Sequence, residues 1–133
     1  GLLTDQQAAA VETAPLERFL KSDLAEEIRR ADGVLREYRF TLLMDERDYD
    51  PAATSGDRML LQGVVDCCFE TAAGLTVVDF KTDRVRTPEE IAERAAHYRP
   101  QLEAYSHALE RVLEKTVARR VLYFLGPGQT VEV

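Results

Sequence analysis

Alternation of apolar and polar side chains predicts strands in the middle of the chain. Residues 34–43 alternate and are rich in β-forming side chains, which indicates a strand. Two longer apolar runs follow, at residues 59–70 and 75–81, separated by only four residues that include Gly74. Two apolar runs joined by so short a segment are typical of a β-hairpin.

Helical signals lie on both sides of these strands. Within residues 1–31, Ser22 stands before an acidic turn, which predicts a helix that begins there. A threonine N-cap, then Pro88 and an acidic pair, predict a second helix that begins at Pro88. Pro100 is expected to stop or kink that helix, and a further helix should run to about Lys115.

The end of the chain returns to the sheet. Residues 117–125 form another apolar run, a Gly-Pro-Gly turn follows, and the last residues predict an edge strand. The order α, β, β, β, α, β predicts the α/β class, with a mixed sheet flanked by helices. Residues 45–57 are polar and lack an apolar period. Because this is long for a connection, we expect a mobile loop with a functional role.

Length and composition limit the class of protein. A chain of 133 residues, 45% apolar and 31% charged, is expected to form one domain, residues 1–133, around a single core. It has neither an apolar run of about 18 residues nor a visible signal peptide, so we expect a cytoplasmic protein that does not enter membranes. Cys67 and Cys68 are neighbours on a predicted strand and point to opposite faces. They are therefore expected in the core without a disulfide.

Three charged residues on the predicted hairpin carry the candidate chemistry. Asp79 and Lys81 are two apart on one strand, so their side chains share a face. With a four-residue hairpin loop, paired positions sum to 145, which sets Asp66 directly opposite Asp79. Their Cβ atoms should then lie roughly 4.5–5.5 Å apart, a separation at which two buried carboxylates destabilise a sheet.

Two compensations are open to such a carboxylate pair: one carboxyl binds a proton, or a divalent cation lies between the two. Magnesium suits the second, because it takes carboxylate oxygens and keeps several waters. Lys81 would then orient an attacking water and stabilise the charge that develops on a phosphate. The alternative is that Asp79 and Lys81 form a solvated ion pair at a strand end, with no catalytic role.

Three motifs follow one another in the order of a known nuclease family. They are Gly63-Val64-Val65-Asp66, Val77-Val78-Asp79-Phe80-Lys81-Thr82-Asp83 and Tyr98-Arg99-Pro100-Gln101-Leu102-Glu103-Ala104-Tyr105. Together they resemble the RecB-like nuclease domains of the PD-(D/E)XK, or restriction-endonuclease-like, fold. They resemble in particular the C-terminal nuclease domain of AddA subunits in AddAB helicase–nucleases. The resemblance covers roughly residues 17–125.

The resemblance implies roles for the hairpin residues. Asp66 and Asp79 would be metal ligands, with the Phe80 carbonyl as a further ligand. Lys81 would be the catalytic lysine. Glu37 lies on the strand before the hairpin, where the family often has an acidic residue, and the alternation around it leaves its role open.

The third motif brings two more candidates. Gln101 and Tyr105 match a Gln-x-x-x-Tyr pattern that, in the family, lies beside the site and the DNA backbone. Tyr105 also falls on the apolar stripe of its predicted helix, so a purely structural role is the alternative.

The resemblance further implies the reaction and its setting. It implies a hydrolase that cuts DNA with Mg²⁺, or with Mn²⁺ as a substitute. Such an exonuclease domain would belong to an ATP-binding helicase that acts in double-strand-break repair and DNA recombination. Its partners would be DNA, the helicase domains of the same full-length chain and an AddB-like second subunit. The alternatives are a stand-alone endonuclease and a non-catalytic docking domain of the same fold.

One departure from the family concerns a histidine. Family members carry a metal-site histidine on a helix before the first strand, whereas His97 and His107 both follow Lys81 and are expected on helix surfaces. We therefore expect a fragment of a larger helicase–nuclease that lacks this upstream helix. Its activity in isolation is then in question.

The net charge of −7 also needs an explanation, because DNA-binding domains are usually basic. It fits a nuclease to which a helicase motor delivers the strand. A scatter of arginines after the hairpin would help to hold DNA, although such a scatter is also typical of a solvated helix face. These arginines are Arg84, Arg86, Arg94 and Arg99.

Overall fold

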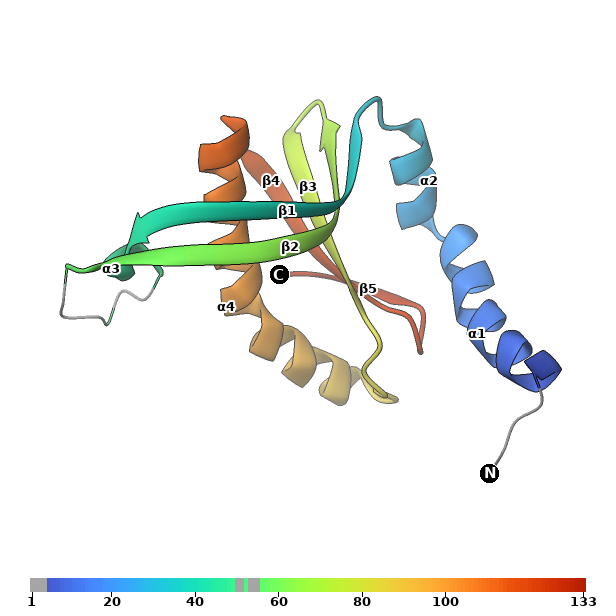
Figure 1. Ribbon diagram of the computed structural model, residues 1–133. Coiled ribbons are helices and arrows are strands. Elements are labelled where there is room, and N and C mark those ends of the chain that lie inside the picture. Colours follow the sequence, from blue (N-terminus) through green and yellow to red (C-terminus); the bar gives the residue numbers. More distant parts are fainter. Residues whose placement is uncertain (1–4, 50–51, 53–55) are drawn as a thin grey trace.

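The computed structural model describes residues 5–49, 52 and 56–133 (Figure 1). Two helices, a short helix within the sheet region and one long helix accompany five strands. In chain order these are α1 Asp5–Leu20, α2 Asp23–Arg30, β1 Val34–Asp45, α3 Glu46–Tyr49, β2 Arg58–Thr71, β3 Gly74–Lys81, α4 Pro88–Leu113, β4 Val117–Phe124 and β5 Gln129–Glu132.

The five strands form one mixed sheet in the order β1-β2-β3-β4-β5. Neighbouring strands are antiparallel except β3 and β4, which are parallel and are joined by the crossover helix α4. The expected α/β class with a mixed sheet and flanking helices is therefore confirmed. The edge strand expected at the end of the chain is present as β5.

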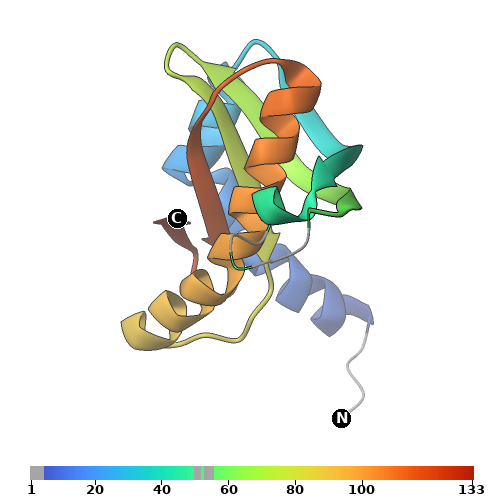
Figure 2. The same ribbon diagram turned by 90° about the vertical axis from the view of Figure 1, so that its left-hand side faces the viewer.

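Helices cover the two faces of the sheet (Figure 1 and Figure 2). On one face α4 buries Leu102 and Leu109 against strand residues such as Phe124. On the other, Leu24 and Ile28 of α2 pack with residues of β2, β3 and β4. The neighbouring thiols Cys67 and Cys68 are buried in opposite clusters and unpaired, as expected for adjacent residues of a strand.

The long helix α4 corrects one expectation. The helix begins at Pro88 as predicted, with Thr87 accepting a hydrogen bond from the Glu90 amide at 3.1 Å. Pro100 does not stop it, because one continuous helix runs from Pro88 to Leu113. Figure 1 and Figure 2 show that this helix is bent, in keeping with a kink at an internal proline. Burial of side chains on both sides of Pro100 holds both halves on the sheet.

The segment expected as a loop, residues 45–57, is only partly described. Asp45 ends β1, and α3, Glu46–Tyr49, follows at once, so the prediction of an irregular loop is wrong there. A four-residue helix is too short to leave an apolar period in the sequence. Positions 50, 51 and 53–55 lie outside the described residues, and so does most of the expected loop. None of the helices described is long and apolar enough to cross a membrane.

The hairpin of β2 and β3 has the predicted register. Glu70 pairs with Leu75 and Cys68 with Val77, which continues the sum of 145. The turn is tighter than expected, since Thr71 and Gly74 also pair and only two residues connect them. Gly74 adopts a φ of 135°, and an added Cβ there would lie 2.7 Å from the Thr116 carbonyl oxygen.

Candidate active site

The strands β1 and β2 turn over at one level of the sheet. Pairing is regular on both sides of this level, but the ladder leaves out Glu37 and Asp66, which face each other in its register. Val65 packs with the α4 side, whereas Cys67 packs with the α2 side. Uninterrupted alternation would keep Val65 and Cys67 on one face. Glu37 absorbs part of this turn with a φ of 49°, in the left-handed region, and Figure 1 shows both ribbons bending.

Asp66 occupies the place where the ladder between β2 and β3 ends. The last backbone pair is Cys67 with Val78, and the same register sets Asp66 opposite Asp79. Here the Asp66 carboxylate, not a backbone carbonyl, accepts the Phe80 amide at 2.8 Å. A side chain has thus replaced a strand as the partner of the β3 backbone.

The Asp66 and Asp79 carboxyls interact directly. Burial, together with the hydrogen bond and charge of Asp66, raises the pKa of Asp79 to about 6, and the Lys81 ammonium opposes this change. The structure therefore brings together the two carboxyls that the register was expected to oppose. Near neutral pH this pair lies close to the point at which it binds a proton.

Lys81 lies next to this pair with a carboxylate on one side and an aromatic ring on the other. Its Nζ is 2.9 Å from Asp79 Oδ2, and these side chains are only 17% and 18% exposed. The same Nζ lies 3.9 Å from the centroid of the Tyr98 ring, within the range of a cation–π contact. The ion pair is mostly buried, which contradicts the alternative of a solvated pair at a strand end.

Tyr105 and Gln101 lie on α4 where it crosses β1 and β2. The Tyr105 ring meets the Phe40 ring edge-on, with centroids 5.1 Å apart. An added Cβ at Gly63 would lie 2.7 Å from Tyr105 Cζ, so the glycine of the first motif makes room for this ring. Gln101 Nε2 donates to the Tyr105 hydroxyl at 3.3 Å. Tyr105 is therefore packed against the sheet and polar at its tip.

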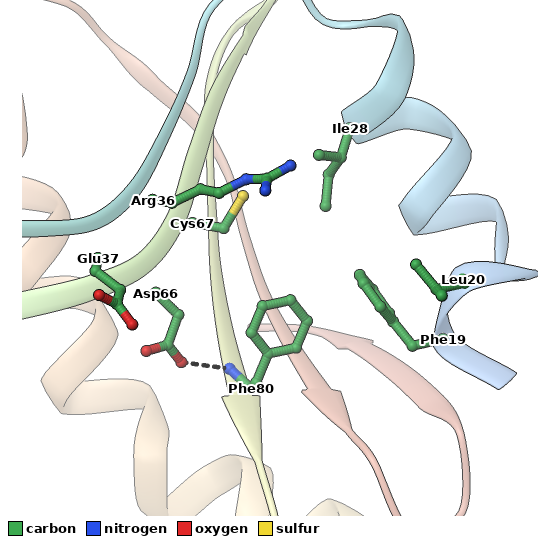
Figure 3. A pocket seen from close by; sticks show the side chains of 8 residues that line it. All are labelled: Phe19, Leu20, Ile28, Arg36, Glu37, Asp66, Cys67 and Phe80. Atoms are coloured by element: carbon green, nitrogen blue, oxygen red, sulfur yellow. Dashed lines mark hydrogen bonds between the residues drawn. The ribbon is translucent and has the colours of Figure 1, made fainter. Parts of the chain in front are cut away.

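A cleft of about 630 Å³ opens between the sheet and the first two helices (Figure 3). Figure 3 shows the Glu37 and Asp66 carboxylates on one side of it and the Phe80 ring on the other. Phe19 closes the apolar side, with its ring 5.0 Å from that of Phe80. The cleft thus joins an apolar wall to the carboxylate pair; its lining is Phe19, Leu20, Ile28, Arg36, Glu37, Asp66, Cys67 and Phe80.

The donor atoms of this site fit a magnesium ion better than a soft metal. No group of three or more His, Cys, Asp or Glu side chains suited to a metal occurs among the described residues. Magnesium does not require one, because it is usually held by one or two carboxylates and keeps waters or substrate phosphate oxygens. The N–H and C=O of one strand residue point to the same side. Since the Phe80 amide points to Asp66, its carbonyl also points toward β2.

Three residues that the sequence analysis did not single out as a group form a closed network behind Lys81. Asp83 accepts the Tyr98 hydroxyl at 3.0 Å and Arg94 Nε at 2.9 Å. Arg94 also donates to the Tyr98 hydroxyl at 3.1 Å. Arg94 is therefore engaged within the protein, which corrects its expected role as a free DNA contact. The one sequence signal was the spacing of Arg94 and Tyr98, one helical turn apart.

The remaining candidates lie on the surface. His97 and His107 are exposed on α4, as expected, and neither reaches the carboxylate pair in the way a metal ligand must. Of the arginines that follow the hairpin, three are exposed: Arg84, Arg86 and Arg99.

Comparison with known proteins decides the family. The family model described as the PD-(D/E)XK nuclease superfamily matches residues 3–132, nearly the whole chain. The chain belongs to this superfamily. The resemblance inferred from the three motifs is thereby confirmed, and the Asp66, Asp79 and Lys81 geometry belongs to a PD-(D/E)XK nuclease domain.

Curated relatives of this PD-(D/E)XK domain share one description, the A subunit of an ATP-dependent helicase/nuclease. The protein from Acetivibrio thermocellus is 36% identical over 132 residues, which cover 96% of this chain and 10% of the relative. Those from Bacillus velezensis and a Thermoanaerobacter species are 31% and 35% identical over 98% of this chain and 11% of each relative. The chain thus spans about a tenth of the length of these relatives.

Proposed function

We propose that the domain hydrolyses DNA phosphodiester bonds with a divalent metal, Mg²⁺ or Mn²⁺ as its substitute. The observation that carries this proposal is the contact of two partly buried carboxyls with one ammonium beside them. Two like charges at this separation need a compensating cation or proton. Membership of a nuclease superfamily favours the cation over a purely structural proton.

The proposed roles follow from the donor chemistry. Asp66, Asp79 and the Phe80 carbonyl hold the metal, which when bound supplies positive charge to a phosphate oxygen and lowers the pKa of a coordinated water. Lys81 donates hydrogen bonds to the attacking water or to the charge that grows on the phosphate. Asp66 stays aligned because the Phe80 amide donates to it.

Gln101 and Tyr105 are proposed to meet the DNA backbone. The Gln101 side chain is exposed on α4, and its amide orients the Tyr105 hydroxyl. Neutral donors of this kind bind phosphate oxygens and carry no sequence information. The rest of Tyr105 packs on the sheet, so its structural and binding roles are compatible.

The proposed setting is a helicase–nuclease that processes DNA ends in repair and recombination. Its support is the description of the relatives as helicase/nuclease subunits and the small share of them that this chain covers. A net charge of −7 fits this setting, because a domain that receives its strand from a motor needs little DNA affinity of its own. The partners would be DNA, helicase domains in the same protein and a second, AddB-like subunit.

The test is cleavage of a labelled single-stranded oligonucleotide by the 133-residue chain with Mg²⁺ or Mn²⁺. Chelation of the metal should stop cleavage, and Lys81→Ala should lower its rate by about 10²–10³, the usual loss for one transition-state contact. Calorimetric titration with Mn²⁺ should show binding by the parent chain and its loss in Asp79→Asn. Cleavage that survives chelation, or equal Mn²⁺ binding by both chains, would refute the proposal.

A docking domain without catalysis makes the opposite prediction for Lys81. If the ammonium only compensated buried carboxylates, Lys81→Ala would destabilise the fold by roughly 3–5 kcal/mol. Cleavage would then be lost only through unfolding. Retained thermal stability with lost cleavage supports the catalytic role. A variant that melts early and still cuts at low temperature would place the chemistry elsewhere.

A further inference from the structure

We propose that Tyr98 is the positioning residue of Lys81, which it holds over its ring face while Asp83 and Arg94 fix the ring. This inference rests on the proposed function, in which Lys81 acts on the scissile phosphate. The observation is a chain of contacts from the lysine to the ring and from the ring to two charged residues. Nothing in the three motifs themselves assigns this role to Tyr98.

The first link holds the ammonium. A lysine side chain has four rotatable bonds and loses about 2 kcal/mol of rotamer entropy when it is fixed. Asp79 holds Lys81 by an ion pair of 2.9 Å, and the Tyr98 ring holds it from a centroid distance of 3.9 Å. The two holders differ in kind, since one is a charge and the other is a neutral ring.

That difference matters for the reaction. A carboxylate neutralises the ammonium and takes one of its three hydrogen-bond donors. An aromatic face attracts the ammonium without cancelling its charge or using a donor atom pair. When Asp79 turns to another cation, the ring keeps Lys81 in place with its donors free for an anionic phosphate.

The second link fixes the ring. The Tyr98 hydroxyl lies 3.0 Å from both oxygens of Asp83 and accepts from Arg94 at 3.1 Å. Arg94 Nε closes the triangle on Asp83 at 2.9 Å, and these two side chains are 38% and 16% exposed. A phenol with three polar contacts cannot rotate its ring away from Lys81 without breaking them.

The third link ties this network to the backbone that carries Lys81. Asp83 follows Lys81 by two residues, in the connection from β3 to α4, while Arg94 and Tyr98 lie one turn apart on α4. The network therefore anchors the end of β3 to the first half of α4. The helix that crosses back over the sheet thus also sets the height of the lysine.

The experiment compares Tyr98→Phe with Tyr98→Leu in the 133-residue chain. Phenylalanine keeps the ring and should keep kcat within a few-fold, whereas leucine removes it. In Tyr98→Leu, kcat for oligonucleotide cleavage should fall by about 10- to 100-fold with KM little changed. His107→Leu is the control for loss of an exposed ring from the same helix and should leave kcat unaltered.

A second readout does not depend on activity. Protons on the Lys81 ε-carbon lie against the ring face, so their NMR signals should be shifted upfield in the parent chain and in Tyr98→Phe, and should return to ordinary positions in Tyr98→Leu. Equal kcat in parent and Tyr98→Leu, or an unchanged Lys81 signal in that variant, would overturn the inference. If the parent chain does not cleave DNA, the proposed function fails, and the NMR comparison alone still decides the contact.

Discussion

At the scale of single residues, the Asp79 carboxyl makes the stability of the fold depend on pH. Its pKa is raised to about 6 from 3.8, mainly by burial. A raised pKa in the folded state means that this contribution to stability is complete below about pH 4 and is lost as pH rises through about 6. The difference corresponds to about 3 kcal/mol at neutral pH.

Asp79→Asn should remove this loss. The variant should melt at nearly the parent temperature at about pH 4, and roughly 5–10 °C above it at about pH 7.5. Thermal melts across this range, without metal, provide the measurement. A difference in melting temperature that does not change with pH would contradict the assignment of the raised pKa to Asp79.

Asp83→Asn is a control of opposite sign. Burial works to raise the pKa of Asp83, but the Tyr98 hydroxyl and the Arg94 guanidinium outweigh it and lower that pKa. A lowered pKa gives stability that is present above the unfolded value and lost in acid. This variant should therefore be less stable than the parent at neutral pH, and the deficit should shrink as the pH falls.

The residues of the hairpin were predictable because strand alternation and register are nearly deterministic. The sum of paired positions sets Asp66 opposite Asp79 from the order of residues alone, and the hairpin has that register. The Asp83, Arg94 and Tyr98 network was not predictable, because its members come from a connection and a helix, whose relative position depends on packing. The left-handed conformation of Glu37 also left no local signal, since glutamate has no preference for it.

At the scale of elements, the fit of α4 on the β1–β2 ribbon depends on Gly63. An added Cβ would lie 2.6 Å from Phe40 Cζ and 2.7 Å from Tyr105 Cζ. Gly63→Ala should therefore destabilise the fold by about 1–3 kcal/mol, as overpacking of a dense interior does. Denaturant unfolding measures this, and Gly33→Ala is the matched control, because a Cβ there meets nothing within 4 Å.

The expected cause can be separated from a general intolerance of strand substitutions. If the Tyr105 ring is the obstacle, Tyr105→Leu should cost less in the Gly63→Ala background than in the parent chain. Such coupling is expected between residues in contact. Strictly additive effects of the two changes would show that alanine acts at this position in another way.

The same element shows where sequence patterns mislead. Pro100 lacks an amide hydrogen and was expected to stop or kink the helix, yet α4 continues through it with a bend. Ala95 and Leu102 are buried on the two sides of the proline. Tertiary packing of both halves outweighs the loss of one helical hydrogen bond, and no window of sequence contains that information.

At the scale of the whole molecule, the charge of −7 and the site place different demands on the domain. Phosphate contacts supply most non-specific affinity for DNA, and in this chain 24 acidic side chains outnumber 17 basic ones. The proposed metal ligands and Lys81, in contrast, lie together on β2 and β3, with Tyr98 of α4 against them. We therefore expect a division of labour, in which another part of the protein holds the strand and this domain cuts it.

Fusion of the chain to a sequence-neutral single-strand-binding domain tests this division. Tethering turns substrate capture into an intramolecular step, so the apparent KM should fall by about 10²–10⁴ while kcat stays the same. The fused protein should also show a steeper loss of cleavage with added salt, because its affinity now depends on phosphate contacts. The same fusion carrying Lys81→Ala should bind DNA equally well and fail to cut it. A fusion that raises kcat instead of lowering KM would mean that the DNA-holding partner also completes the chemistry.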